Sequence, residues 1–92
     1  MPDARATEPK GDRRLLIVDD DKSFLDRLAR AMESRGFQVA TAESVAAGLA
    51  QVAASPPAYA VVDLRLNDGN GIEVIQALKE KRPDARAVVL TG

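Results

Sequence analysis

The 92 residues leave room for one domain, and a composition of 46% hydrophobic and 29% charged residues is typical of a globular protein. The formal net charge of -1 gives no sign of a basic nucleic-acid-binding face, and the absence of cysteine and histidine excludes disulfides, thiolate or imidazole metal sites and a phosphohistidine within the chain. No apolar run approaches the roughly 20 residues that span a bilayer, so we expect a cytoplasmic protein with no membrane partner.

Segments of strand character alternate with segments of helical periodicity after a polar stretch at residues 1–13, which predicts a flexible leader. Strands are expected at residues 15–18, 37–41, 59–62 and 87–90. Helices are expected where apolar residues recur at helical spacing, namely Phe24, Leu25, Leu28, Ala29 and Met32, then Val45, Leu49 and Val52, then Ile72, Ile75 and Leu78. The expected N-caps are Asp21 or Ser23, Ser44 and Asn70, and the expected stops are Gly36, Pro56 and Pro83.

This alternation, with short connections, predicts an α/β protein with a parallel sheet and helices on both faces. A stretch at residues 66–71 is dense in turn-forming residues and separates the third strand from the third helix. The fourth strand is followed only by Thr91 and Gly92, so we expect a doubly wound sheet that is truncated after its fourth strand.

Acidic side chains stand where two of the strands end: Asp19 and Asp20 after the first, and Asp63 after the third. Ligands of open α/β sheets bind beyond the carboxyl ends of the strands, and neighbouring strands lie about 4.8 Å apart. If the first and third strands are neighbours, the three carboxylates converge, and a hard cation such as Mg²⁺ relieves their repulsion. Such a site suits phosphoryl transfer to a carboxylate, whereas each acid taken alone is equally explained as a solvated turn or a helix cap.

The combination resembles the response-regulator receiver family across residues 14–92. The segments that carry the resemblance are LIVDDD at 16–21, VVDLRL at 61–66 and VVLTG at 88–92. The segments FLDRLARAM at 24–32 and DLRLNDGNG at 63–71 are, more particularly, similar to the redox-responding global regulators of purple bacteria and rhizobia. Those regulators pair a receiver with a C-terminal Fis-type helix-turn-helix.

The resemblance implies a flavodoxin-like (CheY-like) fold and a role for each site residue. Asp63 would accept the phosphoryl group from a sensor histidine kinase. Mg²⁺ would be held by Asp20, by Asp19 through water, by Asp63 and by the main-chain carbonyl of Arg65. Thr91 would contact the phosphoryl group. The domain would be a switch, not an enzyme, and DNA would be bound only through a domain that these 92 residues do not include.

Two alternatives stay open from the sequence. A haloacid-dehalogenase-type phosphatase also has Asp-x-Asp after its first strand, matched here by Asp19 and Asp21, and Asp19 would then be the nucleophile. The other alternative is an interaction module that is never phosphorylated.

Receivers of the family continue with a lysine at the end of a fifth strand and with further helices. A fourth strand without that cover would be an apolar edge, so we also expect a homo-oligomer.

Overall fold

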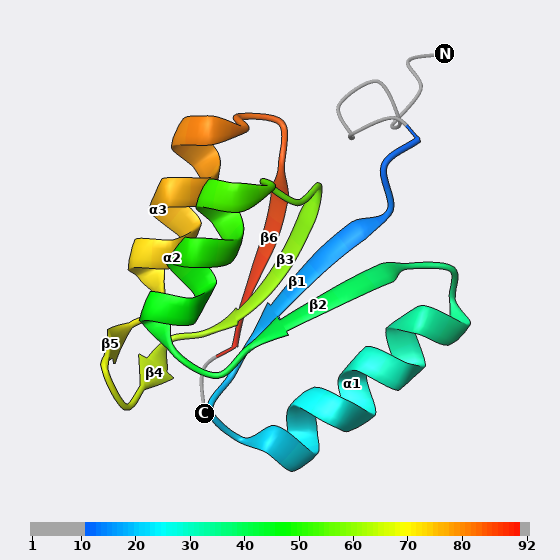
Figure 1. Cartoon of the computed structure of the whole chain (residues 1–92), viewed down its shortest axis with the longest axis horizontal. Helices are drawn as coiled ribbons and strands as arrows, with labels where there is room; N and C mark the ends of the chain where they lie inside the picture. The colour runs from blue at the N-terminus through cyan, green and yellow to red at the C-terminus, as the bar shows by residue number, and fades with distance from the viewer. Residues whose placement is uncertain (1–10, 91–92) are drawn as a thin grey trace.

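The computed structural model describes residues 11–90, and Figure 1 shows them as a single layer of strands between helices. Most of the predicted leader and the predicted phosphoryl-contacting Thr91 lie outside the described residues. The elements are β1 (Arg14–Val18), α1 (Lys22–Ser34), β2 (Gln38–Ala42), α2 (Val45–Ala54), β3 (Tyr59–Asp63), β4 (Arg65–Leu66), β5 (Gly69–Asn70), α3 (Ile72–Lys81) and β6 (Arg86–Leu90). Among the described residues, no helix is long and apolar enough to cross a membrane.

Four parallel strands form the main sheet in the order β2-β1-β3-β6. β1 and β3 are therefore neighbours, as the convergence of the acids requires, and their register pairs Val18 with Val62. α1 covers one face of the sheet, whereas α2 and α3 cover the other (Figure 1). The doubly wound parallel sheet expected from the sequence is thus confirmed.

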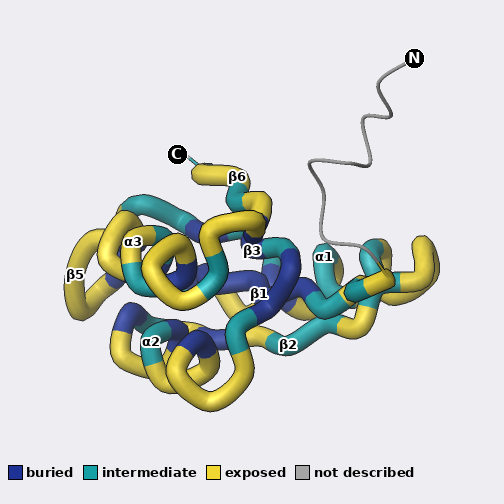
Figure 2. Tube along the Cα trace, turned by 90° about the horizontal axis from the view of Figure 1, so that it is seen from above, coloured by how far each residue is buried: buried dark blue, intermediate teal, exposed yellow. Residues whose placement is uncertain are grey.

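The buried side chains of the sheet alternate between the two faces, which produces two separate cores. Leu16 and Val18 of β1 pack with residues of α2 and α3, while Leu15 and Ile17 pack with residues of α1. All four are at most 3% exposed, so β1 is apolar on both faces, as expected for a central parallel strand. In Figure 2, β1 runs through the buried centre of the molecule.

Two of the predicted helix caps are confirmed and one is wrong. The side chain of Asp21 accepts a hydrogen bond from Phe24 N–H, and that of Ser44 accepts one from Ala47 N–H. The N-cap of α3 is Gly71 and not Asn70, which is a strand residue of the short β4–β5 hairpin. The Asn70 side chain nevertheless accepts a hydrogen bond from Ile72 N–H at 2.9 Å, at the start of the helix.

The buried residues of α3 differ in part from the expected apolar series. Val74 and Leu78 are fully buried, whereas Ile72, which the spacing assigns to the apolar series, is 37% exposed. The stretch at residues 66–71, which the sequence predicts to be a turn, lies in a two-stranded antiparallel ribbon whose tip is formed by residues 67 and 68. The position of this ribbon matters because it directly follows Asp63.

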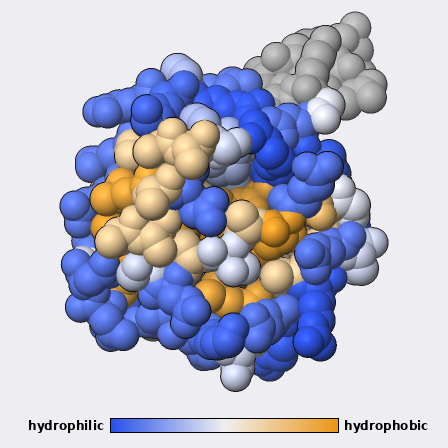
Figure 3. Space-filling view, viewed as in Figure 1, coloured by the Kyte–Doolittle hydropathy of each residue, from blue (hydrophilic) through white to orange (hydrophobic). Residues whose placement is uncertain are grey.

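Apolar groups are also exposed away from the acids. Figure 3 shows apolar atoms gathered on one face of the molecule, within a hydrophilic border. A cavity of about 440 Å³ lies at the amino ends of β1 and β2, and its lining includes Leu15, Val39 and Gln51. This cavity is at the opposite end of the strands from Asp19 and Asp63, so it takes no part in the site described below.

Candidate functional site

The three predicted acids meet at the carboxyl ends of the two central strands. Asp19 and Asp20 follow β1, and Asp63 is the last residue of β3. Each offers a carboxylate oxygen, and these three oxygens all lie within 4.8 Å of one another. Among the described residues, this is the group of acidic side chains close enough to hold one metal ion. The convergence predicted from the sequence is therefore present, although Asp19 and Asp63 are 44 positions apart in the chain.

Asp19 is buried and held in place by the backbone on both sides. Its N–H donates to Ala42 O at 3.0 Å, and its Oδ1 accepts the Asp21 N–H at 2.9 Å. Burial raises the pKa of the Asp19 carboxyl, and the negative charges of Asp63 and Asp20 raise it further, against the opposing hydrogen bond from Asp21 N–H. The site thus contains more negative charge than its own hydrogen bonds neutralise, which is the electrostatic condition that favours a bound cation.

Asp63 is only partly buried, which leaves its carboxylate open to a reactant. One of its oxygens, Oδ1, accepts the Arg65 N–H at 3.1 Å. The next residue, Leu64, donates its backbone N–H to Leu90 O at 3.1 Å, and this hydrogen bond connects the segment after Asp63 to the end of β6. The side chain of Asp63 is therefore oriented by one hydrogen bond while its second oxygen has no partner among the described residues.

The β4–β5 hairpin begins immediately after Asp63 and carries the predicted carbonyl ligand. Gly71 N–H donates to Leu64 O at 3.0 Å, and this bond flanks the Arg65–Asn70 pair of the ribbon. In an antiparallel ladder, the two residues of a pair flanked in this way form no backbone hydrogen bonds with each other. The Arg65 carbonyl is consequently not used by the ribbon, which is what a metal ligand at this position needs.

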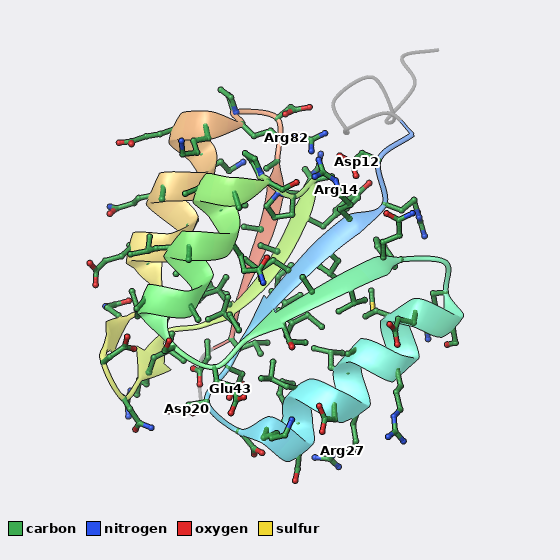
Figure 4. The ribbon with its side chains drawn as sticks, in the orientation of Figure 1. Asp12, Arg14, Asp20, Arg27, Glu43 and Arg82 are labelled. Carbon is green, nitrogen blue, oxygen red and sulfur yellow. The ribbon has the colours of Figure 1, made fainter. Side chains whose placement is uncertain are left out.

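Two features of the site have no counterpart in the sequence reasoning. Gly71 approaches the Asp63 backbone so closely that a Cβ at this position would lie 2.0 Å from Asp63 O. Asp68, at the tip of the hairpin, accepts hydrogen bonds from the first residues of α2. The two glycines within residues 69–71 indicate a close backbone approach, but no local pattern indicates the contact between Asp68 and Val45, which are 23 residues apart. β2 is also followed by an acid, the exposed Glu43, which Figure 4 labels together with Asp20.

The fold and the acidic cluster define a receiver domain of a response regulator. Residues 15–92 match the family model described as response regulator receiver domain, and the chain belongs to this family. The chain is 62% identical to the photosynthetic apparatus regulatory protein RegA of Rhodobacter capsulatus over 92 residues, which are all of this chain and 50% of the relative. It is 60% identical to the acid tolerance regulatory protein ActR of Rhizobium meliloti over 81 residues, which are 88% of this chain and 42% of the relative.

Solved structures agree with this assignment. A response regulator of Burkholderia pseudomallei, crystallised with a phosphorylated aspartic acid, a calcium ion and citrate, superposes with a TM-score of 0.82 at 37% identity, covering 88% of this chain and 48% of that one. The response regulator TrrA of Thermotoga maritima, in complex with Mg²⁺ and BeF, gives a TM-score of 0.78 at 25% identity and coverages of 86% and 69%.

The resemblance to regulators of purple bacteria and rhizobia is thereby confirmed, as is the CheY-like fold. The phosphatase alternative is not favoured. The chain spans about half the length of the curated relatives that it matches.

Proposed function

We propose that Asp63 accepts a phosphoryl group from a sensor histidine kinase, in a reaction that depends on Mg²⁺ held beside it. The observation that supports this most directly is the convergence of three carboxylate oxygens within 4.8 Å at the carboxyl ends of β1 and β3. Asp19 is buried, whereas Asp20 and Asp63 are both partly exposed. Of these two, Asp63 is the one whose carboxylate is oriented by a hydrogen bond, from Arg65 N–H, and the one that the resemblance assigns as the acceptor. Asp63 is thus the acceptor, and Asp19 and Asp20 are the charge that holds the cation.

The residues fit Mg²⁺ because they offer only hard oxygen donors. Asp19, Asp20, Asp63 and the Arg65 carbonyl would hold the ion, with water completing the small octahedral shell that Mg²⁺ prefers. When bound, the ion offsets negative charge on the carboxylates and on the phosphoryl oxygens. The Burkholderia pseudomallei structure, with a phosphorylated aspartic acid and a calcium ion, supports a divalent cation at such a site.

The chain's own residues account for the remaining steps. The Arg65 N–H holds one oxygen of Asp63 and so aims the other at the incoming phosphorus. That oxygen forms a bond to phosphorus as the bond from phosphorus to the donor's leaving group breaks, which gives an aspartyl phosphate and a free donor. The hydroxyl of Thr91, which lies outside the described residues, is predicted to contact a phosphoryl oxygen.

Incubation with acetyl phosphate and Mg²⁺, followed by mass spectrometric mapping of the modified residue, tests the assignment. Label on Asp63 is the expected result, and both Asp63→Asn and Asp20→Asn should abolish it, the second through loss of the cation. Label on Asp19 would instead favour the phosphatase chemistry. No label under these conditions would favour an interaction module that is never phosphorylated.

We further propose that the parent regulator acts in the cytoplasm and contacts DNA only through a segment outside these 92 residues. The chain covers 50% of RegA and 42% of ActR, so these regulatory proteins contain a further segment in which a DNA-binding part would lie. Self-association also stays a prediction. It is supported by Val88 and Val89 on the edge strand β6, which are 58% and 38% exposed. Light scattering at tens of micromolar tests it, and a purely monomeric protein would contradict it.

A further inference from the structure

Asp68 connects the hairpin after Asp63 to the start of a helix that lies elsewhere in the sequence. Its Oδ1 accepts the Val45 N–H at 2.8 Å, and its Oδ2 accepts the Ala46 N–H at 3.1 Å. These are the first two residues of α2. The next N–H, that of Ala47, is bonded by Ser44 Oγ at 3.0 Å. The first turn of α2 therefore has two caps, one from its own sequence and one supplied by the hairpin.

The carboxylate suits this position on electrostatic grounds. The first N–H groups of a helix have no partner within the helix, and its N-terminus attracts negative charge. The hydrogen bonds from Val45 and Ala46 lower the pKa of the Asp68 carboxyl, which therefore carries its charge throughout the neutral range. The backbone of the hairpin tip also lies beside Val45, because even a Cβ built on Gly69 would come within van der Waals distance of Val45 Cγ2, at 3.5 Å. The tip of the hairpin thus rests directly on α2.

The same hairpin determines where the Arg65 carbonyl lies. At its base the Leu64–Leu90 hydrogen bond holds it to the sheet and the Gly71–Leu64 hydrogen bond closes it, and along its length Leu66 is buried in the core. At its tip, Asp68 supplies the side-chain hydrogen bonds to the body of the domain that the structure describes. A hairpin of two residues per strand has little rigidity of its own, so its tip needs such a contact to hold one orientation.

We propose that Asp68 is a positioning residue for the phosphoryl-accepting site: by fastening the hairpin tip to the N-terminus of α2, it holds the Arg65 carbonyl where it and Asp63 reach the same cation. This inference rests on the proposed function of Asp63 and its metal. A binding free energy shared between two sites is reciprocal. Mg²⁺ at the carboxylates should therefore protect the Val45 and Ala46 amides, and loss of Asp68 should weaken Mg²⁺ binding.

The test measures Mg²⁺ affinity and amide hydrogen exchange in the same set of variants by NMR, with Mg²⁺ alone as the probe. Asp68→Ala removes both acceptor oxygens, and we expect Mg²⁺ to bind about tenfold more weakly, as for other residues that orient metal ligands. We also expect the Val45 and Ala46 amides to lose their Mg²⁺-dependent protection. Asp68→Asn keeps the shape and one acceptor oxygen, and should lose about threefold in affinity, between the wild type and Asp68→Ala.

Two controls separate positioning from simple capping of α2. Ser44→Ala removes the other cap of α2 without touching the hairpin, and should leave Mg²⁺ affinity within about twofold of the wild type, even though Ala47 exchanges faster. Asn67→Ala changes the exposed neighbour of Asp68 in the same hairpin and should change neither measurement. Circular dichroism establishes whether each variant is folded. If Asp68→Ala is unfolded, the test is made with Asp68→Asn alone.

The outcomes distinguish this inference from the function on which it rests. Wild-type Mg²⁺ affinity in both Asp68 variants, with only faster exchange at α2, would make Asp68 a helix cap and overturn the positioning role while leaving the proposed function intact. Equal weakening in Ser44→Ala and Asp68→Ala would overturn it as well, because the effect would then come from α2. A wild-type protein that binds no Mg²⁺ would overturn the proposed function together with this inference.

Discussion

Replacing Gly71 by alanine should destabilise the protein strongly, although its backbone conformation does not require glycine. Gly71 has φ -60° and ψ -17°, a region that every residue adopts, so no conformational strain is expected. The obstacle is steric. An added Cβ would lie 2.0 Å from Asp63 O, 2.6 Å from Val62 Cγ1 and 3.0 Å from the Asp63 carbonyl carbon. Non-bonded carbon atoms normally approach to about 3.5–4.0 Å, so these groups would have to move apart by about 1 Å or more.

The groups that would have to move are parts of the central sheet. Asp63 and Val62 belong to β3, which is paired on both sides, and Asp63 lies opposite Leu90 of β6. Overpacking of a well-packed core costs about 1–3 kcal/mol, and a clash with backbone belongs at the upper end of that range. We therefore expect Gly71→Ala to lose about 3 kcal/mol, a large part of the stability of a small domain.

Gly48→Ala provides the matched control. Gly48 lies within α2, where alanine is favoured over glycine by about 1 kcal/mol. Its added Cβ would meet the methyl groups of Val74 at 3.1 Å and Val18 at 3.3 Å, which are side-chain atoms able to shift by a few tenths of an ångström. Propensity and crowding then oppose each other, and the variant should stay within about 1 kcal/mol of the wild type.

Urea unfolding followed by far-ultraviolet circular dichroism measures both variants. With a slope of about 1 kcal/mol per molar urea, as small proteins show, Gly71→Ala should lower the midpoint by about 3 M or leave the protein unfolded, while Gly48→Ala should shift it by at most about 1 M. The phosphorylation rate at Asp63 should fall in Gly71→Ala as well, because its carbonyl is displaced. A Gly71→Ala midpoint within about 0.5 M of the wild type would refute the steric reasoning.

Further predictions concern the charged groups. Hydrogen bonds from Arg14 and Arg82 hold the pKa of Asp12 well below its ordinary value of about 3.9, so the stability they contribute is present above that pH and is lost as the pH falls below it. Asp12→Asn should therefore cost about 1–2 kcal/mol at pH 7 and progressively less towards pH 2; an equal cost at both would contradict this. The raised pKa of Asp19 has the opposite sign, because ionisation then costs stability as the pH rises through its folded value. Without Mg²⁺ at pH 7, Asp19→Asn should stabilise the protein by about 1–3 kcal/mol, because it removes both the cost of burying a charge and the repulsion from Asp63 and Asp20. The same change should weaken Mg²⁺ binding, and a destabilised metal-free variant would argue against this electrostatic cost.

The order of the main elements and the acidic cluster were predictable because both depend on local patterns and on one general rule. Short apolar runs bounded by acids indicated buried strands, and Asp21 and Ser44 indicated the starts of α1 and α2. Parallel strands present their carboxyl ends at one edge, so acids that follow the first and third strands had to meet if the strands were adjacent. The roles given to Asp63 and Arg65 came from the resemblance and not from the spacing.

The hairpin after Asp63 was not predictable because its two strands are too short to show a periodicity. Its sequence, rich in asparagine, aspartate and glycine, indicates only a turn. The hairpin includes Asn70, so α3 begins after it and its N-cap is Gly71. The exposure of Ile72, the first residue of α3, is a second departure from the expected apolar series. The contacts of Asp68 with α2 and of Asp12 with Arg82 join residues 22 to 70 positions apart, for which a single sequence contains no local signal.

The packing of the sheet explains how a small domain holds three mutually repelling carboxylates close together. The three acids lie at the end of β1 and β3, the strands whose side chains are buried in both cores, so their positions are determined by packing and not by their mutual interaction. Because the acids cannot move apart, their repulsion is lowered only by a bound positive charge or by the loss of a negative charge at the site. Mg²⁺ and the neutral side chain in Asp19→Asn relieve the same repulsion, so their stabilising effects should not add. At the same Mg²⁺ concentration, the gain in stability should be smaller in the variant than in the wild type. Equal gains in the two proteins would show that the cation binds away from Asp19 and would remove the electrostatic basis of the site.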